Sequence, residues 1–482
     1  MSGLHEECGV FGIYSPESYD IATDTYHALY ALQHRGQESC GITVNDAGVF
    51  SSYKDVGLVG EVFTREKLDR IGTGSISIGH VRYATTGHRS RENAQPLVIN
   101  HIKGSFAVCH NGNLTNTSAL REELELGGAI FHTTSDTEVI AYIITKERLA
   151  APSIEEAICS AMSKIKGAYS LVMMSTKKLI AARDPFGFRP LCIGKMGDKY
   201  VFASESCALD SIGAEFIRDV EPGELVIVDK NGLRSNRTHC GKEKSALCVF
   251  EFLYFARPDS VIDGASVHVA RRKAGELLAM EHPIDADVVV GVPDSGLDAA
   301  RGYAAYSGIE CGIGFIKNKY IARTFIQPTQ KQREDAVRIK LNPISATVKG
   351  KRVVLIDDSI VRGTTARCIV KLLREAGATE VHMRVSAPPF LNPCYYGTDI
   401  DSREHLIACH HSIKEISDII GTDSLGYLSV ENAKKLAVHA NGCECGYCTA
   451  CFSGEYPTNI PTEMHKDKFD RKISESKEKT TT

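Results

Sequence analysis

Two adjacent carboxylates, Asp357 and Asp358, stand where a short apolar run meets a loop of small residues. The run, residues 353–356, is too short for a helix and has charged flanks, which favours a central β-strand. The loop ends near Gly363, and the periodic stretch 366–376 predicts a helix whose first N–H groups would face an anion. The carboxylates would then meet ribose hydroxyls or Mg²⁺ beside a phosphate. The alternative is a plain strand end with a helix-capping aspartate.

Residues 352–365 resemble the signature of the phosphoribosyltransferases that use phosphoribosyl pyrophosphate (PRPP). The resemblance implies that PRPP is bound by the carboxylates and the loop after them: Asp357, Asp358, Ser359, Arg362, Gly363, Thr364 and Thr365. It also implies that Ser295, at the end of an earlier strand, joins Asp357 and Asp358 around Mg²⁺. The alternative role for Ser295 is to cap the helix predicted from Leu297, and the two roles are compatible.

The stretch 317–342 is rich in charged and amide residues and is too long for an ordinary connection. It resembles the mobile loop of the same transferases, which closes over PRPP and excludes water from the ribose centre. The residues that match this loop are Tyr320, Arg323, Thr324, Gln330 and Arg333, and we expect Tyr320 and Arg333 to contact PRPP. The alternative is a disordered surface loop.

Near the start of the chain, Cys8 opens the short apolar run 8–13. Taken alone, it would be a buried core residue. Downstream, four polar motifs each follow an apolar stretch, at residues 34–37, 79–83, 110–114 and 135–138. Together with Cys8 these motifs resemble the glutaminase domain of the N-terminal-nucleophile (Ntn) amidotransferases.

That resemblance assigns chemical roles within the motifs. Cys8 supplies the thiolate that attacks the glutamine amide, while the Asn111 side chain and the Gly112 backbone N–H stabilise the oxyanion. Arg82 and Asp136 pair with the carboxylate and the ammonium group of glutamine. The complete set expected to bind glutamine is Arg35, Arg82 and Asp136. The alternative for Arg82 and Asp136 is a surface ion pair, which would contribute little.

The Ntn resemblance also predicts a propeptide. In this family the free α-amino group of the nucleophile acts as the base, because an α-amine with a pKa of about 8 is largely available near neutral pH. A cysteine inside the chain has only an amide nitrogen, so we expect residues 1–7 to be cut away between Glu7 and Cys8. The alternative is a plain disordered N-terminus.

Secondary-structure patterns divide the chain in two. Between residues 167 and 228, apolar runs and dense turn residues suggest an antiparallel sheet, so 8–235 is predicted to be an α+β domain, and the resemblance implies an αββα sandwich. Within 236–465, predicted strands alternate with helices, which indicates a doubly wound parallel sheet; these strands lie at residues 287–291, 312–316, 353–356 and 380–385. The charged end, 466–482, is expected to be a disordered tail.

Both halves together resemble one family, the amidophosphoribosyltransferases. The implied reaction converts PRPP, glutamine and water to 5-phosphoribosylamine, glutamate and pyrophosphate, the first step of purine synthesis. The family also implies a homotetramer inhibited by purine nucleotides of the AMP, GMP or ADP type. One alternative is an amidotransferase of the glucosamine-phosphate synthase type, which would need a sugar-isomerase second half. Another is a non-enzymatic nucleotide sensor, which would tolerate loss of Cys8.

The cysteines suggest a further cofactor. The chain has 16 of them, a high count for a compartment in which thiols stay reduced. Four match the ligands of a [4Fe–4S] cluster in the iron–sulfur branch of the family: Cys248, Cys394, Cys448 and Cys451. Zinc is the alternative on sulfur count alone. Cys443 and Cys445 lie just upstream, and Cys445 forms a second C-x-x-C with Cys448 that overlaps the first.

Charge and hydropathy exclude other classes of protein. A formal net charge of −4 without a basic stripe argues against nucleic acid as a partner. No apolar run approaches the ~20 residues that a membrane helix needs. Residues 1–7 have neither a basic flank nor an apolar core, so they are no signal peptide, and we expect a cytoplasmic protein.

Overall fold

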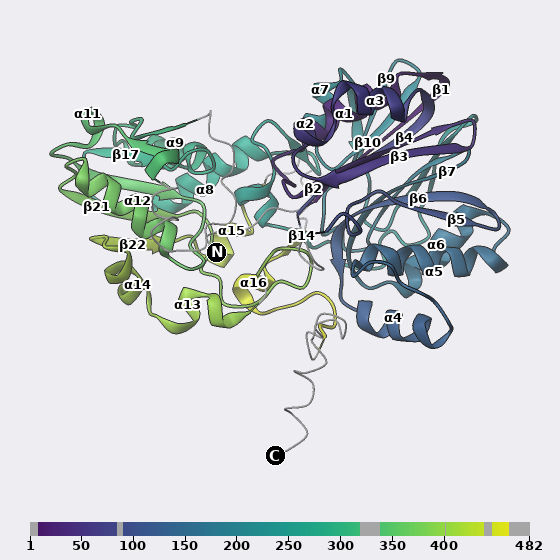
Figure 1. Cartoon of the computed structure of the whole chain (residues 1–482). Helices are drawn as coiled ribbons and strands as arrows, with labels where there is room; N and C mark the ends of the chain where they lie inside the picture. The colour runs from purple at the N-terminus through teal and green to yellow at the C-terminus, as the bar shows by residue number, and fades with distance from the viewer. Residues whose placement is uncertain (1–7, 84–89, 319–337, 401, 438–445, 462–482) are drawn as a thin grey trace, which may run out of the picture.

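The computed structural model describes residues 8–83, 90–318, 338–400, 402–437 and 446–461. Within these ranges the chain forms two units (Figure 1). The first half makes two stacked sheets between helices, and the second half is built around a separate parallel sheet.

The two sheets of the first unit are antiparallel and face each other. Their strand orders are β11-β9-β10-β1-β4-β2-β3 and β13-β12-β8-β7-β6-β5. The strands are β1 (Gly9–Tyr19), β2 (Ser39–Asp46), β3 (Val49–Val56), β4 (Gly74–Arg82), β5 (Leu97–His101), β6 (Gly104–Leu114), β7 (Gly167–Ser175), β8 (Leu179–Arg183), β9 (Cys192–Met196), β10 (Lys199–Ala203), β11 (Glu215–Asp219), β12 (Leu225–Asp229) and β13 (Gly232–Asn236). Because side chains alternate along a strand, Val10 and Ile78 of one sheet meet Val172 of the other in a buried core.

Helices cover the outer face of each sheet. The first sheet is covered by α1 (Ile21–Ala31), α2 (Val59–Val62), α3 (Arg65–Ile71) and α7 (Ser206–Ser211), and the second by α4 (Thr117–Leu126), α5 (Asp136–Ala150) and α6 (Ile154–Lys164). Sequence signals set some helix starts: Asp20 caps α1 and Ser135 caps α5. The layers confirm the αββα sandwich. Strand β13 ends at Asn236, and the domain boundary after residue 235 stays a prediction.

The second unit holds a parallel sheet of order β17-β20-β21-β22. Its main elements are α8 (Val267–Glu281), β17 (Val288–Gly291), α9 (Gly296–Ser307), β20 (Arg352–Asp357), α12 (Thr364–Glu375), β21 (Glu380–Val385), α14 (Ile413–Ile420) and β22 (Ser424–Tyr427). Helices α8 and α9 pack on the face that carries Val354, and α12 packs on the face that carries Leu355. A parallel bridge joins Val289 to Cys311 on the other side of β17, so the order reverses between β17 and β20. Doubly wound sheets bind ligands at this reversal.

The strand predicted at residues 312–316 is only partly right. Strand β18 (Phe315–Lys317) pairs antiparallel with β19 (Leu341–Pro343), outside the parallel sheet. A Cβ at Gly314 would come within 2.4 Å of the Val290 side chain, so the chain crosses close over β17 there and then leaves it. The predicted loop 317–342 therefore starts and ends in a two-stranded hairpin.

Short elements complete the described ranges. They are β14 (Leu247–Cys248), η1 (Glu251–Phe255), β15 (Val261–Ile262), β16 (Ala265–Ser266), α11 (Ser345–Val348), η2 (Arg403–His405), α13 (Ile407–His410), α15 (Val430–Ala433), β23 (Tyr447–Cys448) and α16 (Ala450–Ser453). Among the described residues, no helix is both long and apolar enough to cross a bilayer.

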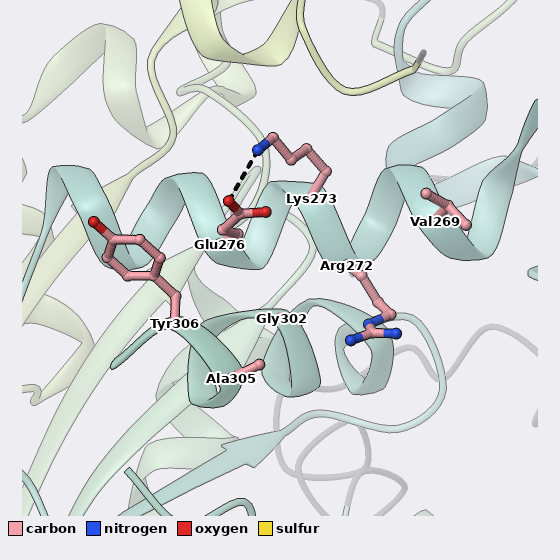
Figure 2. Close-up of a pocket in the computed structure, with 7 residues that line it drawn as sticks. All are labelled: Val269, Arg272, Lys273, Glu276, Gly302, Ala305 and Tyr306. Atoms are coloured by element: carbon pink, nitrogen blue, oxygen red, sulfur yellow. Dashed lines mark hydrogen bonds and ion pairs between the residues drawn. The ribbon is translucent and has the colours of Figure 1, made fainter. Parts of the chain in front are cut away.

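Helices α8 and α9 pack backbone to backbone at two glycines. A Cβ at Gly275 would lie 1.8 Å from the Ala299 carbonyl oxygen, which leaves no room for any side chain. Over this contact the two helices form a shallow hollow on the surface, where Lys273 pairs with Glu276 at 2.9 Å (Figure 2). None of the residues predicted to do chemistry lines this hollow.

Candidate active sites

Cys8 lies half-buried immediately before β1. Its Sγ contacts the Tyr83 carbonyl oxygen at 3.5 Å, and its own carbonyl oxygen accepts a hydrogen bond from Arg35 Nε at 3.0 Å. Strands β1 and β4 are neighbours in the sheet, and Gly9 of β1 pairs with Val81 of β4. Cys8, which precedes Gly9, therefore lies next to the C-terminal end of β4. Arg82, the last residue of β4, is therefore beside the predicted nucleophile.

The predicted oxyanion residues lie on β6 of the facing sheet. His80 of β4 donates from Nε2 to the His110 carbonyl oxygen at 3.0 Å, which joins the two sheets near Cys8. Burial lowers the pKa of His80 to about 3, so this imidazole is neutral. Gly112 has a φ of +140°, a backbone conformation that favours glycine. The Asn111 amide nitrogen is buried without a hydrogen-bond partner in the described structure, as expected of a donor kept for a ligand.

Asp136 is held in its ionised form at the start of α5. Its Oδ2 accepts a hydrogen bond from the Leu114 amide at 3.0 Å, and its Oδ1 lies 3.4 Å from His110 Nδ1. Burial opposes ionisation, but His110, Leu114 and the charge of Arg82 outweigh it and lower the pKa of Asp136. Arg82 and Asp136 thus lie near each other as a buried cation and anion, not as the surface ion pair that was the alternative.

Arg35 has contacts that differ from those of a substrate ligand. Its side chain is fully buried, and besides the Cys8 carbonyl it binds two carboxylates. The distances are 2.6 Å from Nη1 to Glu205 Oε1 and 2.8 Å from Nη2 to Glu251 Oε1. These bonds direct the guanidinium toward the backbone of Cys8 and toward two carboxylates of the protein. They show no contact with a substrate, so the binding of glutamine by Arg35 stays a prediction.

The second site forms at the carboxyl end of β20, next to the start of α9. Ser295 and Ser359 both donate hydrogen bonds to Asp358, so the three residues predicted around Mg²⁺ lie together. Burial raises the pKa of Asp357, and the charge of Asp358 raises it further. Burial also raises the pKa of Asp358, with the two serine hydroxyls partly offsetting the rise. Two buried carboxylates that resist ionisation form a site in which a cation would be strongly favoured.

The loop after the carboxylates has the shape expected of an anion site. Gly363 has a φ of +77° at the N-cap of α12, and Thr364 and Thr365 form its first turn. Gly296 packs so tightly on β20 that a Cβ would lie 2.5 Å from the Ile356 carbonyl oxygen. The loop that carries Ser295 and the loop after β20 therefore meet, and the first N–H groups of α12 open beside the carboxylates.

The four predicted cluster cysteines come together between the two units. Cys248 and Cys448 are paired in the ladder of β14 and β23, and Cys394 packs in the same apolar cluster as Cys448. Burial raises the pKa of Cys451, and the nearby thiols of the other three cysteines raise it further. Burial raises the pKa of Cys448 to about 12. Within the described ranges, no group of three or more His, Cys, Asp or Glu residues has the geometry to hold a single metal ion.

Several predictions lie outside the described residues. They are the propeptide 1–7, Tyr320, Arg323, Thr324, Gln330 and Arg333 of the loop, the alternative cysteines Cys443 and Cys445, and the tail 466–482. The loop's described base is anchored near the second site, where Lys317 pairs with Asp294.

Sequence reasoning missed the buried carboxylates around the first site. Glu38 lies 3.6 Å from Arg82, while Glu205 and Glu251 hold Arg35. Glu38 directly follows the 34–37 motif, which was a usable signal. Glu251 stands in an apolar run 216 positions from Arg35, and nothing in the sequence links the two.

The fold and the two sites define a glutamine amidotransferase joined to a phosphoribosyltransferase. Family models agree: a glutamine amidotransferase domain matches residues 80–211 and a phosphoribosyl transferase domain matches residues 263–414. The amidophosphoribosyltransferase of Bacillus subtilis (strain 168) is 49% identical, over 95% of this chain and 96% of its own length. That of Archaeoglobus fulgidus is 49% identical, over 95% of this chain and 99% of its own. The chain belongs to the amidophosphoribosyltransferase family.

A solved structure agrees along nearly the whole chain. It is the glutamine PRPP amidotransferase from B. subtilis complexed with ADP and GMP. The TM-score is 0.88 at 48% identity, over 95% of this chain and 99% of that chain. The resemblances to the two enzyme families are therefore confirmed.

Proposed function

We propose that the protein hydrolyses glutamine at Cys8 and uses the ammonia to convert PRPP to 5-phosphoribosylamine, with release of pyrophosphate. The observation that carries the first half is the grouping beside Cys8 of a buried cation, a buried anion and an unpartnered amide: Arg82, Asp136 and Asn111. These three supply what a bound amino acid and a tetrahedral oxyanion require.

The glutaminase chemistry uses groups of the chain alone. After removal of residues 1–7, the α-amine of Cys8 takes the proton of its own thiol. The thiolate then attacks the glutamine amide carbon, and the oxyanion accepts hydrogen bonds from the Asn111 amide and the Gly112 N–H. The carbon–nitrogen bond then breaks as the α-ammonium group returns its proton to the leaving nitrogen, which departs as ammonia and leaves a thioester on Cys8. A water molecule attacks this thioester, giving up a proton as the carbon–sulfur bond breaks, and releases glutamate with the Cys8 thiol restored.

The transfer reaction takes place at the second site. The threonines and first N–H groups of α12 bind the phosphate of PRPP, and ammonia displaces pyrophosphate at ribose carbon 1. Asp357 and Asp358, with Ser295, would hold Mg²⁺, which when bound neutralises charge on the pyrophosphate. The loop residues Tyr320 and Arg333 are proposed to cover PRPP and exclude water.

The reaction is the first step of purine synthesis, which suggests control by its end products. We propose inhibition by purine nucleotides of the AMP, GMP or ADP type, supported by the ADP and GMP bound to the B. subtilis relative. A cytoplasmic homotetramer remains part of the proposal.

For the cysteines we propose a [4Fe–4S] cluster held by four thiolates: Cys248, Cys394, Cys448 and Cys451. Support comes from their convergence and from burial at Cys448 and Cys451, which raises the pKa of both thiols, since a buried thiol keeps its proton unless a metal replaces it. The Tyr396 N–H donates to Cys394 Sγ at 3.4 Å, as expected beside a thiolate ligand. Zinc is the alternative that metal analysis would distinguish.

The decisive experiment separates the two chemistries. Cys8→Ala should abolish PRPP-dependent glutamate release and glutamine-dependent synthesis, but spare synthesis from added ammonia. Cys109→Ala, a buried cysteine of β6, is the matched control and should keep both activities. Equal loss of both activities in Cys8→Ala would refute the two-site proposal.

A further inference from the structure

The end of β6, residues 110–113, carries both proposed oxyanion donors and is held at each of its two ends. Its first residue is bound within the first unit, where His80 Nε2 donates to the His110 carbonyl oxygen at 3.0 Å. Its last residue is bound by the second unit, because Asn113 Nδ2 donates to the Tyr395 carbonyl oxygen at 3.0 Å. The two oxyanion donors lie between these anchors, one from each unit.

A turn of the second unit, residues 395–398, also packs on the backbone between the anchors. Gly397 has a φ of +116°, a conformation that favours glycine. A Cβ on Gly397 would lie 3.3 Å from the Gly112 carbonyl carbon and 3.4 Å from the Gly112 Cα, so the two glycines meet backbone to backbone. A Cβ on Gly112 would in turn lie 2.2 Å from the Ala168 carbonyl oxygen of β7. Gly112 is therefore confined both by β7 and by this turn.

A buried arginine ties the turn to the same strands. Arg189 is fully buried and donates to the Tyr396 carbonyl oxygen from Nη2 at 2.7 Å and from Nε at 3.2 Å. The Arg189 carbonyl oxygen accepts a hydrogen bond from Ser170 Oγ at 3.2 Å, and Ser170 pairs with Asn111 in the ladder of β6 and β7. The Tyr396 ring also stacks on Phe188, with the ring centroids 4.1 Å apart. The turn is thus fixed relative to the strand that carries the donors.

Oxyanion stabilisation depends on donors that are already in place, because a fixed donor needs no reorganisation as the charge develops. Glycine loses more conformational freedom than any other residue when it is fixed, so the Gly112 N–H depends strongly on what surrounds it. We propose that the turn 395–398 forms the outer wall of the oxyanion hole, with Asn113 and Gly397 as positioning residues for the Gly112 N–H. This inference rests on the glutaminase function proposed for Cys8.

An aldehyde analogue of glutamine, with –CHO in place of the side-chain amide, tests the positioning directly. The Cys8 sulfur bonds to the aldehyde carbon, and the thiol proton reaches the aldehyde oxygen by way of the α-amine. The adduct therefore places a tetrahedral oxygen where the oxyanion would lie. Norvaline, with a methyl group in place of the amide, is the comparison ligand, because it offers the same carboxylate and ammonium group but no such oxygen. Both inhibition constants are measured on the mature full-length enzyme.

Two variants disturb the wall from different sides. Asn113→Ala removes the hydrogen bond to Tyr395, and Gly397→Ala presses a Cβ against Gly112. Each should lower kcat for glutamine hydrolysis and weaken inhibition by the aldehyde in parallel, by about 10-fold, less than the 100- to 1,000-fold cost of deleting an oxyanion donor. The KM for glutamine and the inhibition constant of norvaline should stay at their wild-type values, because neither depends on the oxyanion.

Two control variants carry the same substitutions away from the wall. Gly308→Ala adds a Cβ at a φ of +75°, where nothing lies within 4 Å. Asn116→Ala removes a similar hydrogen bond inside the first unit, from Nδ2 to the Lys164 carbonyl oxygen at 2.9 Å. Both should keep the wild-type inhibition constant of the aldehyde. All four variants should keep the rate of synthesis from ammonia, which shows that the second unit is folded. An inhibition constant does not depend on the active fraction, so partial misfolding cannot imitate the expected result.

The inference is overturned if either Asn113→Ala or Gly397→Ala binds the aldehyde as tightly as the wild-type enzyme does. It is also overturned if inhibition by norvaline weakens by the same factor as inhibition by the aldehyde. Failure of the proposed glutaminase function looks different, because the wild-type enzyme would then form no aldehyde adduct on Cys8.

Discussion

Replacing Asp357 with asparagine should make the free protein more stable while it removes phosphoribosyl transfer. Asp357 is 7% exposed and its neighbour Asp358 is 8% exposed, and the pKa of each is raised. A carboxyl whose pKa is higher in the folded protein than in the unfolded chain disfavours folding once the pH exceeds its pKa in the unfolded chain. Asparagine has nearly the same shape and can still accept the hydrogen bond from the Asp358 N–H, 2.9 Å long.

The size of the effect follows from linkage. Each unit by which folding raises a pKa corresponds to about 1.4 kcal/mol of destabilisation at pH values above the folded pKa. For a domain of this size, 1 kcal/mol shifts Tm by roughly 2–4 °C. The destabilisation disappears as the pH falls below the pKa of the carboxyl in the unfolded chain, because the carboxyl is then protonated in both states. The gain in Tm of Asp357→Asn should therefore be large at neutral pH and vanish in acid.

Thermal unfolding without Mg²⁺ or PRPP measures this gain. Asp287→Asn is the control in the same unit, because hydrogen bonds from Arg352 lower the pKa of Asp287 to about 2. A carboxyl whose pKa is lowered by folding stabilises the folded state at pH values above its pKa in the unfolded chain. The Asp287→Asn variant should therefore unfold at a lower temperature at neutral pH. An unchanged or lower Tm for Asp357→Asn would refute the electrostatic reasoning. Retained transfer activity would show that the acceptor site had been misplaced.

The remaining predictions concern the glutaminase site, the N-terminus and the cysteines. Arg82→Gln should raise the KM for glutamine and leave ammonia-dependent synthesis unchanged; an unaltered KM would assign the substrate's carboxylate to another cation. Intact-mass measurement should show that the active protein lacks residues 1–7, and full activity with this segment retained would contradict the Ntn assignment. Anaerobic iron and sulfide analysis should show loss of the cluster in the serine variants of Cys248, Cys394, Cys448 and Cys451, but not in Cys445→Ser. Loss of the cluster in Cys445→Ser, with the cluster retained in Cys448→Ser or Cys451→Ser, would show that the wrong C-x-x-C had been assigned to it.

Sequence patterns predicted the elements that are defined by local periodicity. The run 353–356 became the centre of β20, and the predicted strand 380–385 coincides with β21. The strand at 312–316 was misplaced because its pairing depends on how Gly312 and Gly314 pack on β17, which is a tertiary contact. Local pattern thus identifies where a strand can form, but not which sheet it joins.

Motif residues were predictable for a related reason. Arg82, Asp136 and Asp357 stand at the ends of strands or at the start of a helix, where the sequence marks both the element and the polar side chain. The role of Arg35 was less accessible, because its partner Glu251 comes from the other unit of the fold. A motif identifies a residue type and its place on an element, whereas the bonds of that residue depend on what the remainder of the chain brings to it.

The buried charges around Arg35 raise the question of what this network contributes to the protein. Arg35, Glu205 and Glu251 are each at most 1% exposed. Burial would raise the pKa of Glu205, but His34 and Arg35 hold it below its usual value. Apolar residues of similar volume often stabilise a fold as well as a buried ion pair does, because removing two charges from water is costly. Stability therefore does not explain the network, whereas a fixed direction for the Cys8 backbone does. The same reasoning separates this network from the half-buried pair of Lys273 and Glu276, which contacts neither site.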